Sequence, residues 1–234
     1  MSAAKYILAI DTCGPCGSVA LGRLTGESLE ILGQTELEGR SYSSTLIAAV
    51  GELLMAAGMK LSLLDAIVAV NGPGSFTGVR IALAAVKGLA EAAQIPVVAV
   101  SRLEALAAKS KVSSAALDAH RNEIFLRIGG LEDGNGPPAR ELLAGSAELA
   151  AIDPAPRQIA VCDEAAAALL TAAWPDTELI RCTAPTAADA LRLCTARILA
   201  SNFVDLALLD GHYLRRSDAE IFGEKESAAG AGQR

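Results

Sequence analysis

Two cysteines three residues apart are the most conspicuous candidates for chemistry in this sequence. Cys13 and Cys16 enclose a Gly-Pro pair, and the Cys-x-x-Cys spacing is that of a redox pair or of half a zinc site. A redox pair sits at a helix N-terminus, where the dipole lowers the thiol pKa, but the residues from Gly17 onward alternate as in a strand. A zinc site needs a second ligand pair, and the other candidates are isolated: Cys162, Cys182, Cys194, His120 and His212. The spacing therefore favours a structural turn between two strands.

Two further segments have the composition of anion-binding loops. Asp11 and Thr12 follow an apolar run and precede a glycine turn; this arrangement can hold phosphate and Mg²⁺, or it is a hairpin with a capping aspartate. Residues 72–80 (GPGSFTGVR) join a strand-like run to a helical pattern. Free amides at that helix start can bind an anion, but the segment has neither the Walker lysine nor the Gly-x-Gly-x-x-Gly spacing. A tight turn with close helix packing is the favoured interpretation.

Catalytic constellations are otherwise sparse. The sequence contains no His-x-x-x-His, no Glu-x-x-His and no Ser/His/Asp set in a recognisable frame. Polar groups do cluster at residues 118–123 (DAHRNE), which form either the wall of a site or, more commonly, a solvated hairpin. We therefore expect no catalytic residue, no metal and no cofactor on this chain.

Hydrophobic patterning predicts the elements that position these segments. Strands are expected at 5–11, 17–23, 29–35, 66–71, 96–100, 114–118, 123–128, 159–162 and 179–182. Helices are expected at 42–57, 77–93, 102–109, 163–173 and about 186–200, with a capping box at Ser101/Glu104 and a cap at Thr186/Asp189. The first three strands predict an antiparallel meander, and the strand–helix–strand unit at 66–100 requires parallel pairing. The fold class is thus α/β.

Length and patterning predict two lobes. The 234 residues allow one or two domains. We place a first lobe with partner-binding helices at residues 1–105. A reduced second lobe follows at residues 106–223, with a C-terminal helix that can pack back on the first lobe. Residues 224–234 are expected to be a flexible tail.

Two of the helices have faces of small residues. In the helix at 77–93, Val79, Leu83 and Val86 suit a sheet, which turns Ala85 and Gly88 outward. The helix at 42–57 has a similarly small, uncharged back face. Such faces pack inside the chain or contact another subunit. The expected partner surface comprises Tyr42, Leu46, Ala49, Ala82, Ala85, Gly88 and Ala92.

Composition narrows the functional class. With 20 Lys+Arg against 27 Asp+Glu, the net charge is −7, which disfavours holding nucleic acid without a partner. Hydrophobic residues at 52% and charged residues at 20% exclude a disordered chain. No apolar run reaches the length of about 18 residues needed for a membrane span, and no signal peptide is evident. Five cysteines, an odd number, indicate a reduced, cytoplasmic protein.

These segments together resemble the TsaB family, once called YeaZ. The resemblance rests on residues 7–12, 72–81, 96–101 and 118–123, in matching order over about residues 5–130, and on Tyr213-Leu214-Arg215 near the C-terminus. The signature residues are Asp11, Thr12, Gly72, Gly74, Ser75, Thr77, Gly78 and Arg80. The family often has His where Tyr42 stands, and Ser or Thr in place of the cysteine turn. The resemblance implies an actin/Hsp70/sugar-kinase-like (ASKHA) fold, with two related lobes of mixed sheets flanked by helices.

The resemblance also implies a function. It is a non-catalytic scaffold role in forming N6-threonylcarbamoyladenosine at position 37 of tRNAs that read codons beginning with A. The related TsaD subunit carries metal and catalysis, and the scaffold helps to recruit the TsaE ATPase. The scaffold contacts tRNA only through the complex. The resemblance leaves open whether the free protein is a homodimer. The metal-binding His-x-x-x-His helix of TsaD corresponds here to residues 40–46, which contain no histidine.

Three other functions compete with this interpretation. An ATP-dependent small-molecule kinase of the same superfamily needs a complete nucleotide motif in the second lobe. A metallopeptidase needs metal ligands. A thiol oxidoreductase rests on Cys13 and Cys16 alone. Nucleotide binding at a subunit border also stays open.

Overall fold

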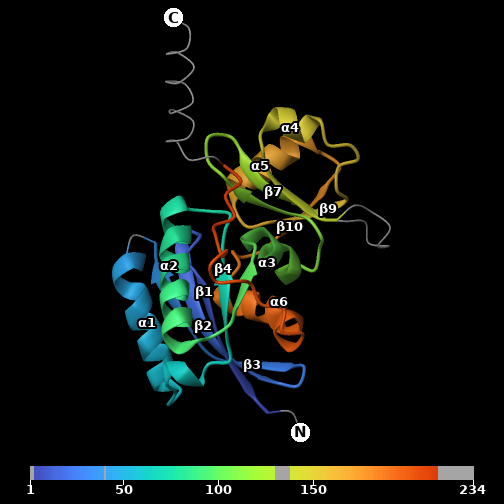
Figure 1. The fold of residues 1–234 in the computed structure, drawn as a ribbon. Coiled ribbons are helices and arrows are strands. Elements are labelled where there is room, and N and C mark those ends of the chain that lie inside the picture. Colours follow the sequence, from blue (N-terminus) through green and yellow to red (C-terminus); the bar gives the residue numbers. More distant parts are fainter. Residues whose placement is uncertain (1–2, 40, 130–137, 216–234) are drawn as a thin grey trace, which may run out of the picture.

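The computed structural model describes residues 3–39, 41–129 and 138–215, which form two five-stranded sheets flanked by helices (Figure 1). This arrangement confirms the predicted α/β fold with two lobes of mixed sheets. The tail expected at residues 224–234 lies outside the described residues.

The first sheet has the order β3-β2-β1-β4-β5. Its strands are β1 (Lys5–Asp11), β2 (Cys16–Thr25), β3 (Ser28–Glu38), β4 (Ala66–Val70) and β5 (Val97–Val100). The first three form the predicted antiparallel meander, whereas β4 pairs in parallel with both β1 and β5. Every residue of β4 is buried, because helices cover both faces of the sheet at this point.

Three helices enclose this sheet. Helices α1 (Tyr42–Ala56) and α2 (Phe76–Ala93) lie side by side on one face, and α6 (Ala187–Leu199) covers the other (Figure 1). Ala190, Leu191 and Cys194 of α6 are buried in the same core as β1 and β4. The C-terminal helix therefore follows the second sheet in sequence but packs on the first. The predicted domain boundary at residues 105/106 stays a prediction.

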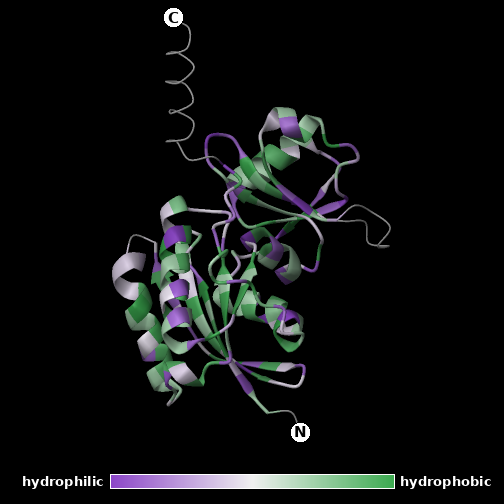
Figure 2. Cartoon of the chain, in the orientation of Figure 1, coloured by the Kyte–Doolittle hydropathy of each residue, from purple (hydrophilic) through white to green (hydrophobic). Residues whose placement is uncertain are grey.

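The second sheet has the order β10-β9-β6-β7-β8. Its strands are β6 (Ala115–Asp118), β7 (Ile124–Ile128), β8 (Arg140–Ala144), β9 (Gln158–Val161) and β10 (Glu178–Arg181). Helix α5 (Glu164–Ala173), with the short α4 (Ser146–Ala150), packs against it, and α3 (Arg102–Lys109) lies between this sheet and α6. Figure 2 shows apolar residues running along the central strands of both sheets, with hydrophilic residues on the outer helices.

Of the two helix caps predicted from the sequence, the one at α6 is confirmed and the capping box at α3 is not. Thr186 and Asp189 form a capping box at the start of α6. Ser101 caps α3 by accepting from the amides of Leu103 and Glu104, but the Glu104 carboxylate binds Arg197 of α6 instead of returning to Ser101. The capping box predicted there was wrong because an interhelical ion pair takes the glutamate. The sequence also missed β8, α4 and the 3-10 turn Leu61–Leu63.

Candidate functional site

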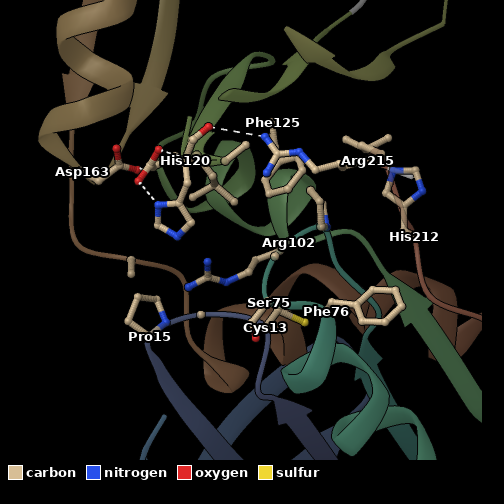
Figure 3. Close-up of a pocket in the computed structure, with 18 of the residues that line it drawn as sticks. Cys13, Pro15, Ser75, Phe76, Arg102, His120, Phe125, Asp163, His212 and Arg215 are labelled. Atoms are coloured by element: carbon tan, nitrogen blue, oxygen red, sulfur yellow. Dashed lines mark hydrogen bonds and ion pairs between the residues drawn. The ribbon is translucent and has the colours of Figure 1, made fainter. Parts of the chain in front are cut away.

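A cavity of about 930 Å³ lies between the two sheets (Figure 3). Most of its lining comes from three parts of the chain: the β1–β2 turn with the start of α2, the second-lobe segments 117–121 and 162–163, and residues 212–215. Gly39, Tyr42, Arg102, Phe125 and Ala184 complete the lining. The structure thus brings the cysteine turn, the glycine segment and the polar cluster after β6 to one place. The cluster at residues 118–123 forms the hairpin between β6 and β7 and is exposed at residues 120–122, as the more common interpretation expected; residues 118–121 also line the cavity.

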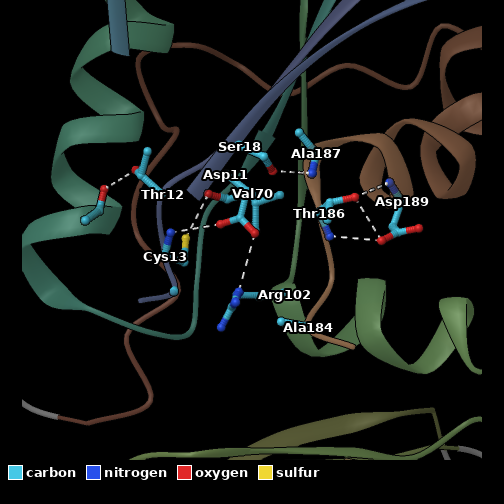
Figure 4. A network of polar contacts seen from close by, with 12 residues as sticks. Asp11, Thr12, Cys13, Ser18, Val70, Arg102, Ala184, Thr186, Ala187 and Asp189 are labelled. Atoms are coloured by element: carbon cyan, nitrogen blue, oxygen red, sulfur yellow. Dashed lines mark hydrogen bonds and ion pairs between the residues drawn. The ribbon is translucent and has the colours of Figure 1, made fainter. Parts of the chain in front are cut away.

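Asp11, at the end of β1, is fully engaged by its neighbours. Its Oδ1 accepts from the amide of Cys13 at 2.8 Å, and its Oδ2 faces Nε of Arg102 at 3.4 Å (Figure 4). Both side chains are buried. Burial acts to lower the pKa of Arg102, but the Asp11 carboxylate, together with smaller contributions from Cys13 and Cys162, outweighs burial and holds that pKa above its ordinary value. Asp11 is therefore the counter-ion of a buried arginine, with both of its oxygens occupied.

The glycine segment packs closely against the β1–β2 turn. A Cβ on Gly74 would lie 2.2 Å from the carbonyl oxygen of Cys13, and one on Gly78 would lie 2.0 Å from that of Thr12. Thr12 donates its hydroxyl to the carbonyl of Gly78 at 2.6 Å. These glycines are required for close approach of backbone to backbone, which agrees with the favoured structural interpretation of the segment.

The remaining signature residues divide between the turn and the helix surface. Ser75 is the N-cap of α2 and accepts from the amide of Gly78 at 3.2 Å. Thr77 and Arg80 lie on the exposed side of α2, where the Arg80 guanidinium stacks 3.8 Å from the centre of the Phe76 ring. Gly72 has φ of 110°, a backbone conformation that favours glycine.

The two cysteines of the turn differ in their environment. Cys13 is buried, and burial followed by the nearby Asp11 carboxylate raises the pKa of its thiol well above the ordinary value. Its Sγ contacts the carbonyl oxygen of Val70 at 3.3 Å, whereas Cys16 is exposed at the start of β2. The turn joins two strands, as predicted, so no helix dipole activates either thiol.

Replacing both turn cysteines with serine is expected to leave the affinity for the expected partner subunits within about tenfold of the wild-type affinity, that is within about 1.4 kcal/mol. A serine hydroxyl at position 13 can donate to the carbonyl of Val70 as the thiol does. The measurement is assembly with partner subunits, together with urea unfolding of Cys13→Ser/Cys16→Ser. A larger loss of assembly in a fully folded variant would show that the thiols have a chemical role.

The second-lobe wall is polar but internally paired. Asp163 caps α5 and accepts from the amides of Ala166 and Asp118. Asp118 accepts from the amide of His120 at 2.7 Å and contacts its Nδ1 at 2.9 Å. Among residues 3–39, 41–129 and 138–215, no group of three or more His, Cys, Asp and Glu side chains is arranged to hold a metal ion.

The C-terminal segment crosses from one lobe to the other and closes one side of the cavity. The amide of His212 donates to the carbonyl of Asn71 at 2.7 Å, and its Nε2 contacts Glu141 of β8 at 2.8 Å. Glu141 also accepts from Ser101 and Arg127. Burial acts to raise the pKa of Glu141, but the hydrogen bonds from His212, Ser101 and Arg127 outweigh it and lower that pKa.

Glu141→Gln is expected to lower the free energy of unfolding at pH 7 by about 1–3 kcal/mol. A carboxylate with a lowered pKa stabilises the folded state above its ordinary pKa of 4.5, and this contribution is lost as the pH falls through the lower folded value. The difference between variant and wild type should therefore shrink in acid. Urea unfolding at pH 7 and near pH 3 measures it, with exposed Glu36→Gln as control. A difference that stays constant with pH would contradict this role of Glu141.

The expected partner surface needs correction. Tyr42, Leu46, Ala49 and Ala82 are buried inside the chain, and the Tyr42 hydroxyl donates to the carbonyl of Gly14 at 2.8 Å. Burial, then the Asp11 carboxylate, raises the pKa of Tyr42 to about 12. These four residues were assigned to the wrong face of their helices, because apolar side chains at helical spacing point to the sheet.

Of the other three expected surface residues, Gly88 and Ala92 are exposed and Ala85 is partly buried. Val79, Leu83 and Val86 face the core as predicted. The outer face of α1 and α2 keeps only Gly88 and Ala92 of the expected residues and is formed by the exposed residues Ser43, Ser44, Ile47, Ala48, Gly51, Glu52, Met55, Ala84, Gly88, Glu91 and Ala92. We call this set the α1–α2 outer face.

Reasoning from the sequence missed Arg102 and His212. Arg102 is the first residue of α3, where the helix dipole disfavours a cation; that mismatch was the available signal that another group binds it. No comparable signal marks His212, whose partner Glu141 is 71 residues away in the chain.

Comparisons with known proteins find similarity to two related groups. The family model for TsaD, tRNA N6-adenosine threonylcarbamoyltransferase, matches residues 34–131. The tRNA threonylcarbamoyladenosine biosynthesis protein TsaB of Haemophilus influenzae is 36% identical over 125 residues, 51% of this chain and 51% of that protein. TsaB of Bacillus subtilis is 37% identical over 123 residues, 51% of this chain and 52% of that protein.

A solved structure is similar over more of the chain. It is from Pseudomonas aeruginosa, is described as an uncharacterized protein with similarity to peptidase YeaZ, and matches with a TM-score of 0.73 at 29% identity, covering 90% of this chain and 100% of that one. The chain spans about half the length of the curated relatives it matches. Within the described part of the chain, no helix has the length and apolar character to cross a membrane.

Proposed function

We propose, from the membership in the TsaB (YeaZ) family that these similarities support, that the chain takes part in tRNA threonylcarbamoyladenosine biosynthesis as a non-catalytic scaffold subunit. In this role it binds a TsaD-like catalytic subunit, helps to recruit a TsaE-like ATPase and contacts tRNA only through the complex. The modified nucleoside is at position 37 of tRNAs that read codons beginning with A. Metal and ATP belong to the partner subunits, and the complex is cytoplasmic.

The observation that carries this proposal is the α1–α2 outer face. Ile47 is 55% exposed and Met55 is 74% exposed. Gly51 and Gly88 each lie inside a helix, and a Cβ added at either position would meet nothing within 4 Å. A glycine inside a helix costs about 0.5–1 kcal/mol relative to alanine, and no contact within the described chain requires these two. Close approach of another helix would require both.

The similarity to TsaD supports the identity of the partner. The matched residues 34–131 contain all of α1 and α2. Two chains of related fold can place corresponding faces against each other around a twofold or near-twofold axis. The same face therefore suits a TsaD-like subunit and, in its absence, a second copy of this chain. Homodimer and complex then exclude each other.

The engagement of Asp11 supports a non-catalytic role. A kinase of this superfamily would use such a carboxylate for a hydrated cation beside phosphate, but here Arg102 and the Cys13 amide occupy its oxygens. A metallopeptidase or thiol oxidoreductase finds no comparable support at the cavity.

Light scattering of the chain alone, and after addition of a TsaD-like subunit from the same source, tests the proposal. We expect a concentration-dependent homodimer that converts to a one-to-one complex, with no ATP hydrolysis by the chain alone. Failure of the chain to bind the TsaD-like subunit, or ATP hydrolysis by the chain after contaminants are removed, would contradict the scaffold role.

A further inference from the structure

We propose that the cavity between the lobes binds an anionic small molecule through a carboxylate or phosphate group, held between the guanidinium of Arg102 and the free amides at the start of α2. This site is distinct from the α1–α2 outer face and does not depend on the scaffold role.

Arg102 provides the first observation. Its side chain is only 6% exposed, yet it lines the cavity and its guanidinium extends into the space between the lobes (Figure 3). Nε faces Asp11, but Nη1 and Nη2 have no hydrogen-bond partner among the described residues. Among the described residues, no fully buried side-chain nitrogen or oxygen lacks a hydrogen-bond partner, so these two nitrogens face the open space of the cavity, where a ligand can reach them. The planar end of a guanidinium matches the two oxygens of a carboxylate or phosphate.

The start of α2 provides the second observation. Gly74, Ser75 and Phe76 line the same cavity. Ser75 caps the amide of Gly78, whereas the amides of Phe76 and Thr77 have no partner in the part of the chain that the structure describes. The helix is 18 residues long, so its dipole favours an anion at this end.

The two parts are held together by the β1–β2 turn. The amide of Ser75 donates to the carbonyl of Cys13 at 2.8 Å, and Nη2 of Arg102 lies over the next residue, Gly14, where a Cβ would be only 2.2 Å away. Gly14 therefore leaves room for the guanidinium beside the start of α2. Arg102 and the start of α2 border the same cavity, and we infer that one ligand bound there contacts both.

Charges on the other walls are compatible with an anion. The acids Asp118 and Asp163 are engaged by His120 and by backbone amides. Arg121 and Arg215 add positive charge to the lining, and Arg215 also pairs with Glu123. The cavity of about 930 Å³ exceeds what one phosphate or carboxylate fills, and Leu117, Phe125 and Tyr213 give it apolar walls. The ligand therefore carries an apolar body beside its anionic group.

Titration of the ¹⁵N-labelled chain with inorganic phosphate, and separately with butyrate, tests the site at constant ionic strength set by chloride. We expect saturable shifts of the Phe76 and Thr77 amides and of the Arg102 Nε–H with at least one of the two. The probe that binds with the higher affinity shows whether the site prefers a phosphate or a carboxylate group. Absence of saturation in both arms would overturn the proposal.

Two variants locate the binding. Phe76→Pro removes one free amide at a position where proline suits a helix, and Ser75 already has φ −56° and ψ 119°, as a residue before proline requires; Phe76→Ala controls for loss of the ring. Asp11→Asn/Arg102→Met removes the guanidinium without leaving a buried charge. We expect affinity to fall about threefold to tenfold for Phe76→Pro relative to Phe76→Ala, and at least about tenfold for the double variant. Affinity unchanged in both would place the anion elsewhere and overturn the proposal.

Discussion

Replacing Gly88 with arginine is expected to abolish binding to the TsaD-like subunit while leaving the isolated chain folded and slightly more stable. Gly88 is exposed near the middle of the outer side of α2, and nothing in the chain lies within 4 Å of a Cβ built there. Any side chain relieves the entropy cost of a helical glycine, so the free energy of unfolding should rise by about 0.5–1 kcal/mol. In a complex the arginine would occupy the space of the partner helix, which normally approaches to about 8–10 Å between axes.

The size of the loss in affinity distinguishes a residue inside the interface from one outside it. We expect at least a hundredfold loss of affinity, about 2.7 kcal/mol or more, and the same for Gly51→Arg on α1. Gly88→Ala should give the same gain in stability with a smaller loss of binding. Ala168→Arg, at an exposed position of α5 in the second lobe, controls for the added charge. Full assembly by folded Gly88→Arg, measured by light scattering and pull-down, would mean that the partner binds elsewhere.

Arg102→Met is expected to lower the free energy of unfolding by about 3–5 kcal/mol, because it leaves the carboxylate of Asp11 buried without its counter-ion. The two side chains are 6% and 2% exposed, so water screens the remaining charge poorly. Such a loss is a large fraction of the 5–15 kcal/mol that stabilises a typical domain.

The double variant Asp11→Asn/Arg102→Met should recover most of this loss. Replacing a buried ion pair by neutral groups of similar volume is often neutral or stabilising, and asparagine can still accept from the amide of Cys13. We expect the double variant to lie within about 1–2 kcal/mol of wild type in urea unfolding, a coupling of the size seen for residues in contact. If the two single losses simply add, the Asp11–Arg102 pair is not the interaction that stabilises this end of β1.

The sequence was most informative where local patterning decides structure. Alternation and apolar runs predicted β1, the meander and the strand–helix–strand unit, and most of the predicted ends lie within one or two residues of the observed ends. This is because each face of these elements is either buried or exposed along its whole length. The strand β8 (Arg140–Ala144) escaped prediction, since its sequence RELLA has neither alternation nor β-branched residues. It is defined by pairing with β7.

The site was less predictable because it depends on contacts between distant parts of the chain. Asp11 and Arg102 are 91 residues apart, and Ser101 and Glu141 are 40 apart. The sequence showed that α1 and α2 are rich in small residues. The pattern did not distinguish the small residues that pack against the sheet from those that are exposed and available to a partner. Burial in the structure separates Ala49 and Ala82, which are core, from Gly51 and Gly88, which are exposed.

Threonylcarbamoyladenosine formed on tRNA by the reconstituted TsaD-like and TsaE-like subunits, with and without this chain, tests the scaffold role most directly. Mass spectrometry of the digested tRNA should show modification with the wild-type chain and with Cys13→Ser/Cys16→Ser. Little or none should form without the chain or with Gly88→Arg. Full modification in the absence of this chain would contradict its role as a required scaffold. Full modification with Gly88→Arg would contradict a scaffold that acts through the α1–α2 outer face.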